Sequence, residues 1–178
     1  MSVFQPIAQK ASEAGLPFLV IGGYAVMAHG FVRATDDLDL LVQGSRRDQW
    51  RGLLEGLGMK VYRERPVFMQ FDPPPGGRLP VDLMFVGEEI FQKMQVEAQS
   101  ASVEGVSFGV VSLLHLIALK CHAIKHGKPL RRIKDTDDLI HLIIYNRLDL
   151  NEPQLRAIIL KHGDPELYEK LQHSCASE

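Results

Sequence analysis

Cysteine is scarce in this sequence of 178 residues, which contains two. Cys121 and Cys175 lie far apart and form neither a metal-type nor a redox-type pair, which fits a reducing compartment. The apolar runs are too short or too interrupted to cross a bilayer. The N-terminal residues lack the basic and apolar regions of a secretory signal. From these absences we expect a soluble, cytoplasmic protein with no membrane partner.

The sequence also lacks an excess of either charge sign, since its formal net charge is −2. This balance argues against a protein whose whole surface coats nucleic acid or membranes, although it allows a local basic patch. A hydrophobic content of 46% and a charged content of 24% are ordinary for a globular protein. The length suffices for one sizeable core, or for one domain with a small appended lobe.

Strand patterns and helix patterns alternate in the first part of the chain, and helix patterns alone follow. Apolar runs bounded by glycine and proline predict strands at 18–21, 37–42, 58–62, 67–71 and 81–86, near 103, and at 108–111. Helical spacing predicts helices at 3–14, 24–29, 45–57, 88–95, 112–125 and 135–145, with Ser45 and Ser112 as N-caps of two of them. Asn151 and Asp164 are predicted to cap two more helices. We therefore predict an α+β fold, with a mixed β-sheet core flanked by helices over residues 1–111. A helical C-terminal lobe over residues 112–178 follows, either as a separate domain or packed with the core as one.

Two acids, Asp37 and Asp39, alternate within an apolar run that is expected to be a strand. Alternate residues of a strand share a face, so these carboxylates should lie side by side while Leu38 and Leu40 point into the core. Such a pair is costly to ionise, and a hard divalent cation removes that cost because carboxylate oxygens are its preferred ligands. A third acid, Asp82, recurs in a similar apolar run. A solvated strand face is the ordinary alternative.

A glycine pair, Gly22-Gly23, separates the strand expected at 18–21 from a short helix. Without Cβ atoms the backbone can approach a phosphate closely, and the N-terminus of a helix offers unpaired N–H groups. By itself the pair would indicate only a tight turn. It precedes the Asp-x-Asp strand, however, and the combination is more informative than either half.

These residues resemble a known family. Gly22-Gly23, then Arg33-x-Thr35-x-Asp37-Leu38-Asp39, then Val81-Asp82-Leu83 are similar to the signature of the nucleotidyltransferase superfamily of the DNA polymerase β type. Within it, Arg-x-Thr-x-Asp-x-Asp most resembles the minimal group that includes the toxins of type IV abortive-infection systems. Leu119-Lys120 and Lys134-Asp135-x-x-Asp138-Leu139 are similar to later motifs of that group.

The resemblance implies a nucleotidyltransferase fold and a role for each matched residue. Catalysis would use two Mg²⁺ ions, or Mn²⁺, held by Asp37, Asp39 and Asp82, with Asp82 also taking the proton of the acceptor hydroxyl. The implied nucleotide-binding residues are Gly22, Gly23, Arg33, Thr35, Lys120, Lys134 and Asp138. Arg33 and Thr35 would alternatively brace the metal strand, and Asp138 with Lys134 or Asp135 would orient Lys120. The toxin resemblance also implies an antitoxin partner.

A basic stretch, residues 120–134, has six Lys or Arg residues and no acid. It is either a solvated loop between helices or a site for the phosphates of a nucleotide or an RNA. His122 and His126 within it have helical spacing, but no third ligand completes a metal motif, so we expect structural or solvent-facing roles.

The leading hypothesis is a Mg²⁺-dependent nucleotidyltransferase that transfers an NMP from an NTP to a hydroxyl and releases pyrophosphate. RNA or tRNA, an aminoglycoside or lincosamide antibiotic, and a protein side chain all remain open as the acceptor. The second hypothesis is a non-catalytic module that binds nucleotide or RNA, and the third is a purely structural domain.

Overall fold

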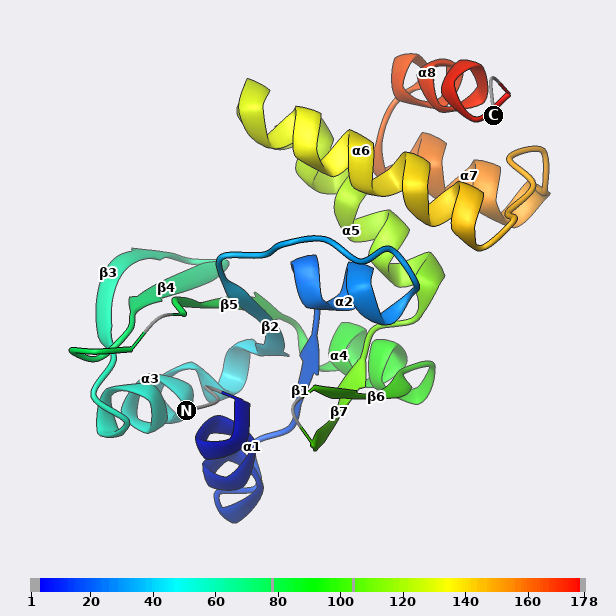
Figure 1. The fold of residues 1–178 in the computed structure, drawn as a ribbon. Coiled ribbons are helices and arrows are strands. Elements are labelled where there is room, and N and C mark those ends of the chain that lie inside the picture. Colours follow the sequence, from blue (N-terminus) through cyan, green and yellow to red (C-terminus); the bar gives the residue numbers. More distant parts are fainter. Residues whose placement is uncertain (1–3, 78, 104, 177–178) are drawn as a thin grey trace. The chain divides into compact units, whose positions relative to one another are not determined.

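The computed structural model describes residues 4–77, 79–103 and 105–176 (Figure 1). The chain divides into two compact units. Unit 1 comprises residues 1–25 and 34–111, and unit 2 comprises residues 26–33 and 112–178. Among the described residues, no helix has both the length and the apolar character that a membrane span requires.

Unit 1 contains a mixed β-sheet in the order β3-β4-β5-β2-β1-β7-β6. Its strands are β1 (Phe18–Val20), β2 (Leu38–Gln43), β3 (Lys60–Arg65), β4 (Phe68–Asp72), β5 (Val81–Val86), β6 (Gln99–Val103) and β7 (Val106–Val110). β2 and β5 are parallel neighbours, as are β1 and β7, whereas the other neighbouring strands run antiparallel. The parallel pairing of β2 with β5 sets residues far apart in the sequence directly opposite one another.

Amphipathic helices pack on this sheet through their apolar faces. They are α1 (Phe4–Glu13), α3 (Arg47–Gly56) and α4 (Glu88–Val96); α2 (Gly22–Ala28) follows β1, and the 3₁₀ helix η1 (Gly44–Arg46) precedes α3. α1 contacts α3 and β7, while α4 contacts β2. In β5 the residues Val81, Leu83 and Phe85 are buried, and the residues between them, starting with Asp82, are partly exposed. β5 therefore has one face in the core and one face that is partly exposed.

Unit 2 is helical and has its own apolar core. Its helices are α5 (Leu113–His126), α6 (Pro129–Tyr145), α7 (Pro153–His162) and α8 (Pro165–Cys175). α5 packs against α6 and α7, and α8 packs against both α6 and α7. The core side chains include Ile117, Leu139 and Ile159. Cys121 lies in this core, and burial raises the pKa of its thiol to about 12, which excludes a reactive thiolate there.

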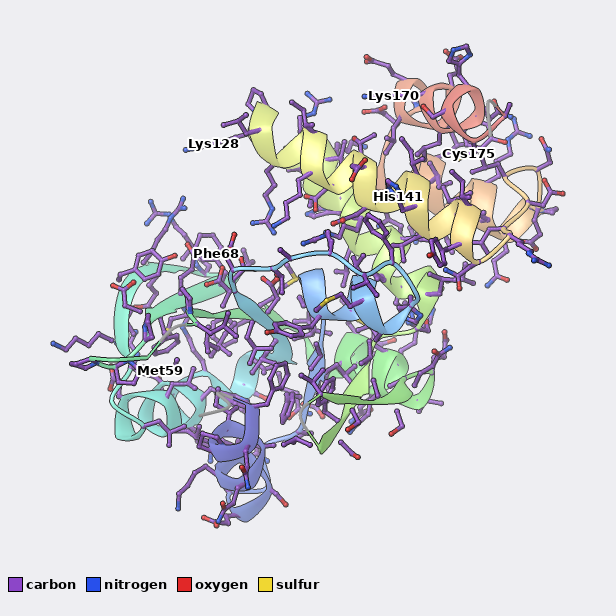
Figure 2. All side chains as sticks on the ribbon, viewed as in Figure 1. Met59, Phe68, Lys128, His141, Lys170 and Cys175 are labelled. Atoms are coloured by element: carbon purple, nitrogen blue, oxygen red, sulfur yellow. The ribbon has the colours of Figure 1, made fainter. Side chains whose placement is uncertain are left out.

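Residues 26–33 belong to unit 2 although they precede most strands of unit 1 in the sequence. The Asn146 side chain donates a hydrogen bond to the carbonyl of His29, and the ring of Phe31 stacks on His141 with 3.9 Å between ring centroids. His141 is labelled on α6 in Figure 2. This short segment, which includes the end of α2, therefore packs on α6 and the residue that follows it.

Most predicted elements are confirmed, and several boundaries are wrong. α2 includes Gly22 and Gly23, which were predicted to precede it, and β3 ends at Arg65 and not at Tyr62. α6 begins at Pro129 and not at Asp135, so most of the stretch 120–134 is helical and not a loop. α3 follows a 3₁₀ turn and has no side-chain cap, so Ser45 is not its N-cap. Glu152, not Asn151, caps α7. The predicted caps Ser112 and Asp164 are confirmed, since each accepts a hydrogen bond from a backbone N–H of the first turn.

Replacing Phe71 of β4 by alanine should destabilise unit 1 by about 3–5 kcal/mol, because this large side chain is fully buried and its loss leaves a cavity. Chemical denaturation followed by circular dichroism measures the change. Val67 in the adjoining turn is 62% exposed, so Val67→Ala is the matched control and should stay within about 0.5 kcal/mol of the parent chain. Equal effects of the two substitutions would contradict the assigned core face.

Candidate active site

Three carboxylates converge at one place in unit 1. Asp39 of β2 lies directly opposite Asp82 of β5 in the parallel register, and Asp37 precedes β2 by one residue. One oxygen from each carboxylate can be chosen so that all three lie within 4.8 Å of one another, and all three residues are half-buried. The predicted grouping of Asp37, Asp39 and Asp82 is therefore present. Asp36 is exposed and lies outside the group.

Asp39 packs against the glycine that opens α2. Gly22 has a φ of +61°, a left-handed conformation that side chains disfavour. A Cβ atom built on Gly22 would overlap the carboxylate of Asp39. The backbone N–H of Ile21, the preceding residue, also donates to the carbonyl of Asp39 at 3.0 Å. Glycine is required here because of its backbone conformation and because the Asp39 side chain occupies the space of a Cβ.

Neutral donors contact the other two carboxylates. The hydroxyl of Thr35 donates to Oδ1 of Asp37 at 3.1 Å, and Nε2 of Gln70 on β4 donates to Oδ2 of Asp82 at 2.5 Å. Neither donor adds charge, so both contacts orient a carboxylate without neutralising it. Three negative groups held together in this way suit a divalent cation, and carboxylate oxygens are the ligands of Mg²⁺ and Mn²⁺.

Tyr62 on β3 lies near this group, although no signal in the sequence identifies it. The pairing of β3 with β4 shifts register between Val61 and Arg63, so Tyr62 is the bulged residue. Burial raises the pKa of Tyr62, and the negative charges of Asp82 and Asp72 raise it further. The side chain is nevertheless 53% exposed.

Gln70 is the other residue that the sequence did not identify. Its strand was predicted at 67–71, but a single glutamine in a strand is not a recognisable signal. Only the β4–β5 pairing, which sets Gln70 opposite Asp82, reveals the contact.

A second cluster of charged residues lies within unit 2. Asp138 is fully buried and accepts hydrogen bonds from Arg33 Nε at 2.6 Å, Arg33 Nη2 at 2.8 Å and Lys120 Nζ at 2.6 Å. Lys120 Nζ also donates to Asp135 at 2.6 Å, and Arg131 lies 3.5 Å from the other oxygen of Asp135. Burial acts to raise the pKa of Asp138, but the hydrogen bond from Arg33 and the charge of Lys120 outweigh it and lower that pKa.

The residues of the basic stretch have different surroundings. Lys120 is buried between Asp135 and Asp138, whereas Lys125 donates to the carbonyl of Gly163 at 2.9 Å. Lys134 is exposed on α6, and Figure 2 shows Lys128 where α6 begins. His122 is exposed and, within the described residues, joins no group of three metal-ligating side chains. Burial lowers the pKa of His122, and the nearby His126 and Lys125 lower it further.

Solved structures with the same fold are nucleotidyltransferases. The antibiotic-resistance factor ANT(2'')-Ia in solution is 21% identical over 98% of this chain and 96% of its own, with a TM-score of 0.68. An antigenic nucleotidyltransferase-like protein from Paracoccidioides brasiliensis is 17% identical over 96% of this chain and 90% of its own, with a TM-score of 0.56. The lincosamide antibiotic adenylyltransferase LnuA with bound lincomycin is 13% identical over 76% of this chain and 93% of its own, with a TM-score of 0.54.

The fold is that of a nucleotidyltransferase. The predicted α+β architecture, with a mixed sheet followed by helices, is thereby confirmed. No protein-family model matches the sequence, and no curated protein is detectably similar to it. The likeness to the solved structures lies below 25% identity, so it defines the fold and leaves the narrower resemblance to the abortive-infection toxins a prediction.

Replacing Gly22 by alanine should displace the Asp39 carboxylate, because the new Cβ would occupy its position. We expect Mn²⁺ binding, measured by isothermal titration calorimetry without nucleotide, to weaken by about tenfold or more, the scale seen when a metal ligand loses its orientation. A Cβ added to Gly52 in α3 would meet only open space, so Gly52→Ala is the control and should leave binding unchanged. Unaltered Mn²⁺ binding by the Gly22→Ala variant would refute this packing argument.

Removing the Asp138 carboxylate with an alanine substitution should destabilise unit 2 by about 3–5 kcal/mol at neutral pH, because Arg33 and Lys120 lose a buried partner. The pKa of Asp138 in the folded protein lies below the ordinary value of 3.8. The ionised carboxylate therefore contributes its full stabilisation to the fold above pH 3.8, and this contribution is lost as the pH falls through the folded pKa. Urea denaturation at neutral and acidic pH should therefore give a difference between the two proteins that shrinks on acidification. Exposed Asp137 provides the control variant, and a pH-independent difference would contradict the ion-pair assignment.

Proposed function

We propose that this chain is a Mg²⁺-dependent nucleotidyltransferase that transfers an NMP from an NTP to a hydroxyl acceptor and releases pyrophosphate. The convergence of Asp37, Asp39 and Asp82 within 4.8 Å is the observation that carries the proposal. Exposed acids are common, but these three are half-buried, approach one another in spite of their charges, and lie on a nucleotidyltransferase fold. A structural role alone gives no reason for such a group.

Each carboxylate has a proposed part in the reaction. Asp37, Asp39 and Asp82 would hold the metal ions. When bound, Mg²⁺ would neutralise phosphate charge and favour ionisation of the acceptor hydroxyl. Asp82 would accept the hydroxyl proton while the acceptor oxygen bonds to the α-phosphorus. The bond from that phosphorus to the bridging oxygen then breaks, and pyrophosphate leaves with the bonding electrons.

The remaining predicted residues divide into two groups. Gly22 and Gly23 begin α2 next to Asp39, which supports their proposed approach to the triphosphate. Thr35 holds Asp37, which favours the bracing role over a phosphate contact. In unit 2, Arg33 and Asp138 stabilise each other and Lys120, and we retain Lys120 and exposed Lys134 as proposed phosphate contacts.

Two classes of acceptor have specific support. An RNA acceptor, tRNA included, is supported by the exposed basic side chains at the beginning of α6, which suit a polyanion; they are Lys128, Arg131, Arg132 and Lys134. An aminoglycoside or lincosamide is supported by the ANT(2'')-Ia and LnuA structures, since one was solved with adenylyl-2''-tobramycin and the other with lincomycin. Incubation with each α-labelled NTP, Mg²⁺ and either total RNA or a panel of these antibiotics distinguishes them by which molecule becomes labelled.

Asparagine substitution of Asp39 or Asp82 should abolish label transfer, because each removes a charge from the metal site and Asp82 also accepts the proton. We expect the rate of label transfer to fall by at least about 100-fold. Removing a group that only hydrogen-bonds to a metal ligand already lowers metal affinity or activity by about 10- to 100-fold. The assay measures acceptor labelling and pyrophosphate release together. Asp36→Asn is the matched control, because Asp36 is exposed and outside the group. Full activity of the Asp82→Asn variant would refute the assigned role.

A further inference from the structure

Gln70 lies in the same cross-strand row as two of the three carboxylates. In the sheet, Asp39 is opposite Asp82, and Asp82 is opposite Gln70. Residues directly opposite one another share a face, so the three side chains project to the same side. This face is the partly exposed one, because Met69 and Phe71, the neighbours of Gln70 in β4, are fully buried on the other side.

The amide of Gln70 contacts Asp82 in a defined way. Nε2 donates to Oδ2 of Asp82, so that one of the two carboxylate oxygens is held by an N–H and rotation of the carboxylate is restricted. The core does not need this amide, because the residue is half-buried on the face that meets solvent.

The residue type also fits the charge at this position. A lysine or arginine here would place a positive charge on Asp82 and compete with a cation for it, whereas an acid would add to the repulsion. A glutamine orients the carboxylate and leaves its charge unchanged. Thr35 has the same relation to Asp37, because its neutral hydroxyl donates to that carboxylate.

We propose that Gln70 is a positioning residue that holds the Asp82 carboxylate in the orientation required for metal binding and proton transfer. This inference rests on the proposed function, because the metal site gives the orientation its purpose. Groups that orient metal ligands by hydrogen bonds typically contribute about 10- to 100-fold to metal affinity or activity.

The test compares Gln70→Met with the parent chain. Methionine keeps the length and flexibility of glutamine but has no N–H donor. We expect Mn²⁺ affinity, measured by calorimetry without nucleotide, to fall by about 10- to 100-fold while Tm stays the same. Gln92→Met is the control, because the Gln92 amide donates to Glu88 on the surface of α4 and not to a carboxylate of the site. Gln70→Ala, which removes the amide by shortening the side chain, should reproduce the effect.

The outcomes separate this inference from the proposed function. If Gln70→Met binds Mn²⁺ as tightly as the parent chain, or loses binding only together with a lower Tm, the positioning role is wrong. Wild-type chain that binds no Mn²⁺ overturns it as well. If wild type binds Mn²⁺ but no acceptor is ever labelled, nucleotidyl transfer fails, and the calorimetric comparison still decides whether Gln70 orients Asp82.

Discussion

The mutual repulsion of three carboxylates is the constraint on which the site in unit 1 depends. At about 4 Å, two like charges near a protein surface repel by roughly 4 kcal/mol at an effective dielectric constant of 20. The chain nevertheless brings Asp37, Asp39 and Asp82 within 4.8 Å of one another. The parallel register of β2 and β5 imposes the approach of two of them, and it is itself stabilised by the buried apolar residues on the other face of these strands. Hydrophobic burial thus offsets the electrostatic cost of the site.

Three contacts of these acids involve neutral groups. Gly22 leaves space for the Asp39 side chain, and Thr35 and Gln70 donate hydrogen bonds to the other two carboxylates. In unit 2 the buried acids Asp135 and Asp138 form ion pairs with Lys120 and Arg33.

The sequence predicted the parts of the structure whose signals are local. The strand at 81–86 and the cap at Ser112 each depend on residues next to one another, and each is confirmed. The short helix was predicted to start after the glycine pair, whereas α2 begins at Gly22 and includes both glycines. The resemblance to the nucleotidyltransferase signature implied that Asp82 would join Asp37 and Asp39, and the three carboxylates do lie together. The start of α6 was missed because a run of charge between two helices is typical of a solvated loop, although Pro129 at its first position marks a helix equally well.

The contacts that depend on strand pairing could not be read from the sequence. Gln70 reaches Asp82 only because β4 and β5 pair in one register, and Tyr62 is placed by a register shift in β3. A shift by one residue would direct either side chain to the opposite face. The pairing of Arg33 with Asp138 likewise joins residues 105 positions apart without a local signal.

The most direct measurement of the central claim is anomalous diffraction from a crystal grown with Mn²⁺ and a non-hydrolysable NTP analogue. We predict anomalous density between the carboxylates of Asp37, Asp39 and Asp82, bridged to phosphate oxygens of the analogue. Crystals that contain the bound analogue but no metal density at these three carboxylates would contradict the account.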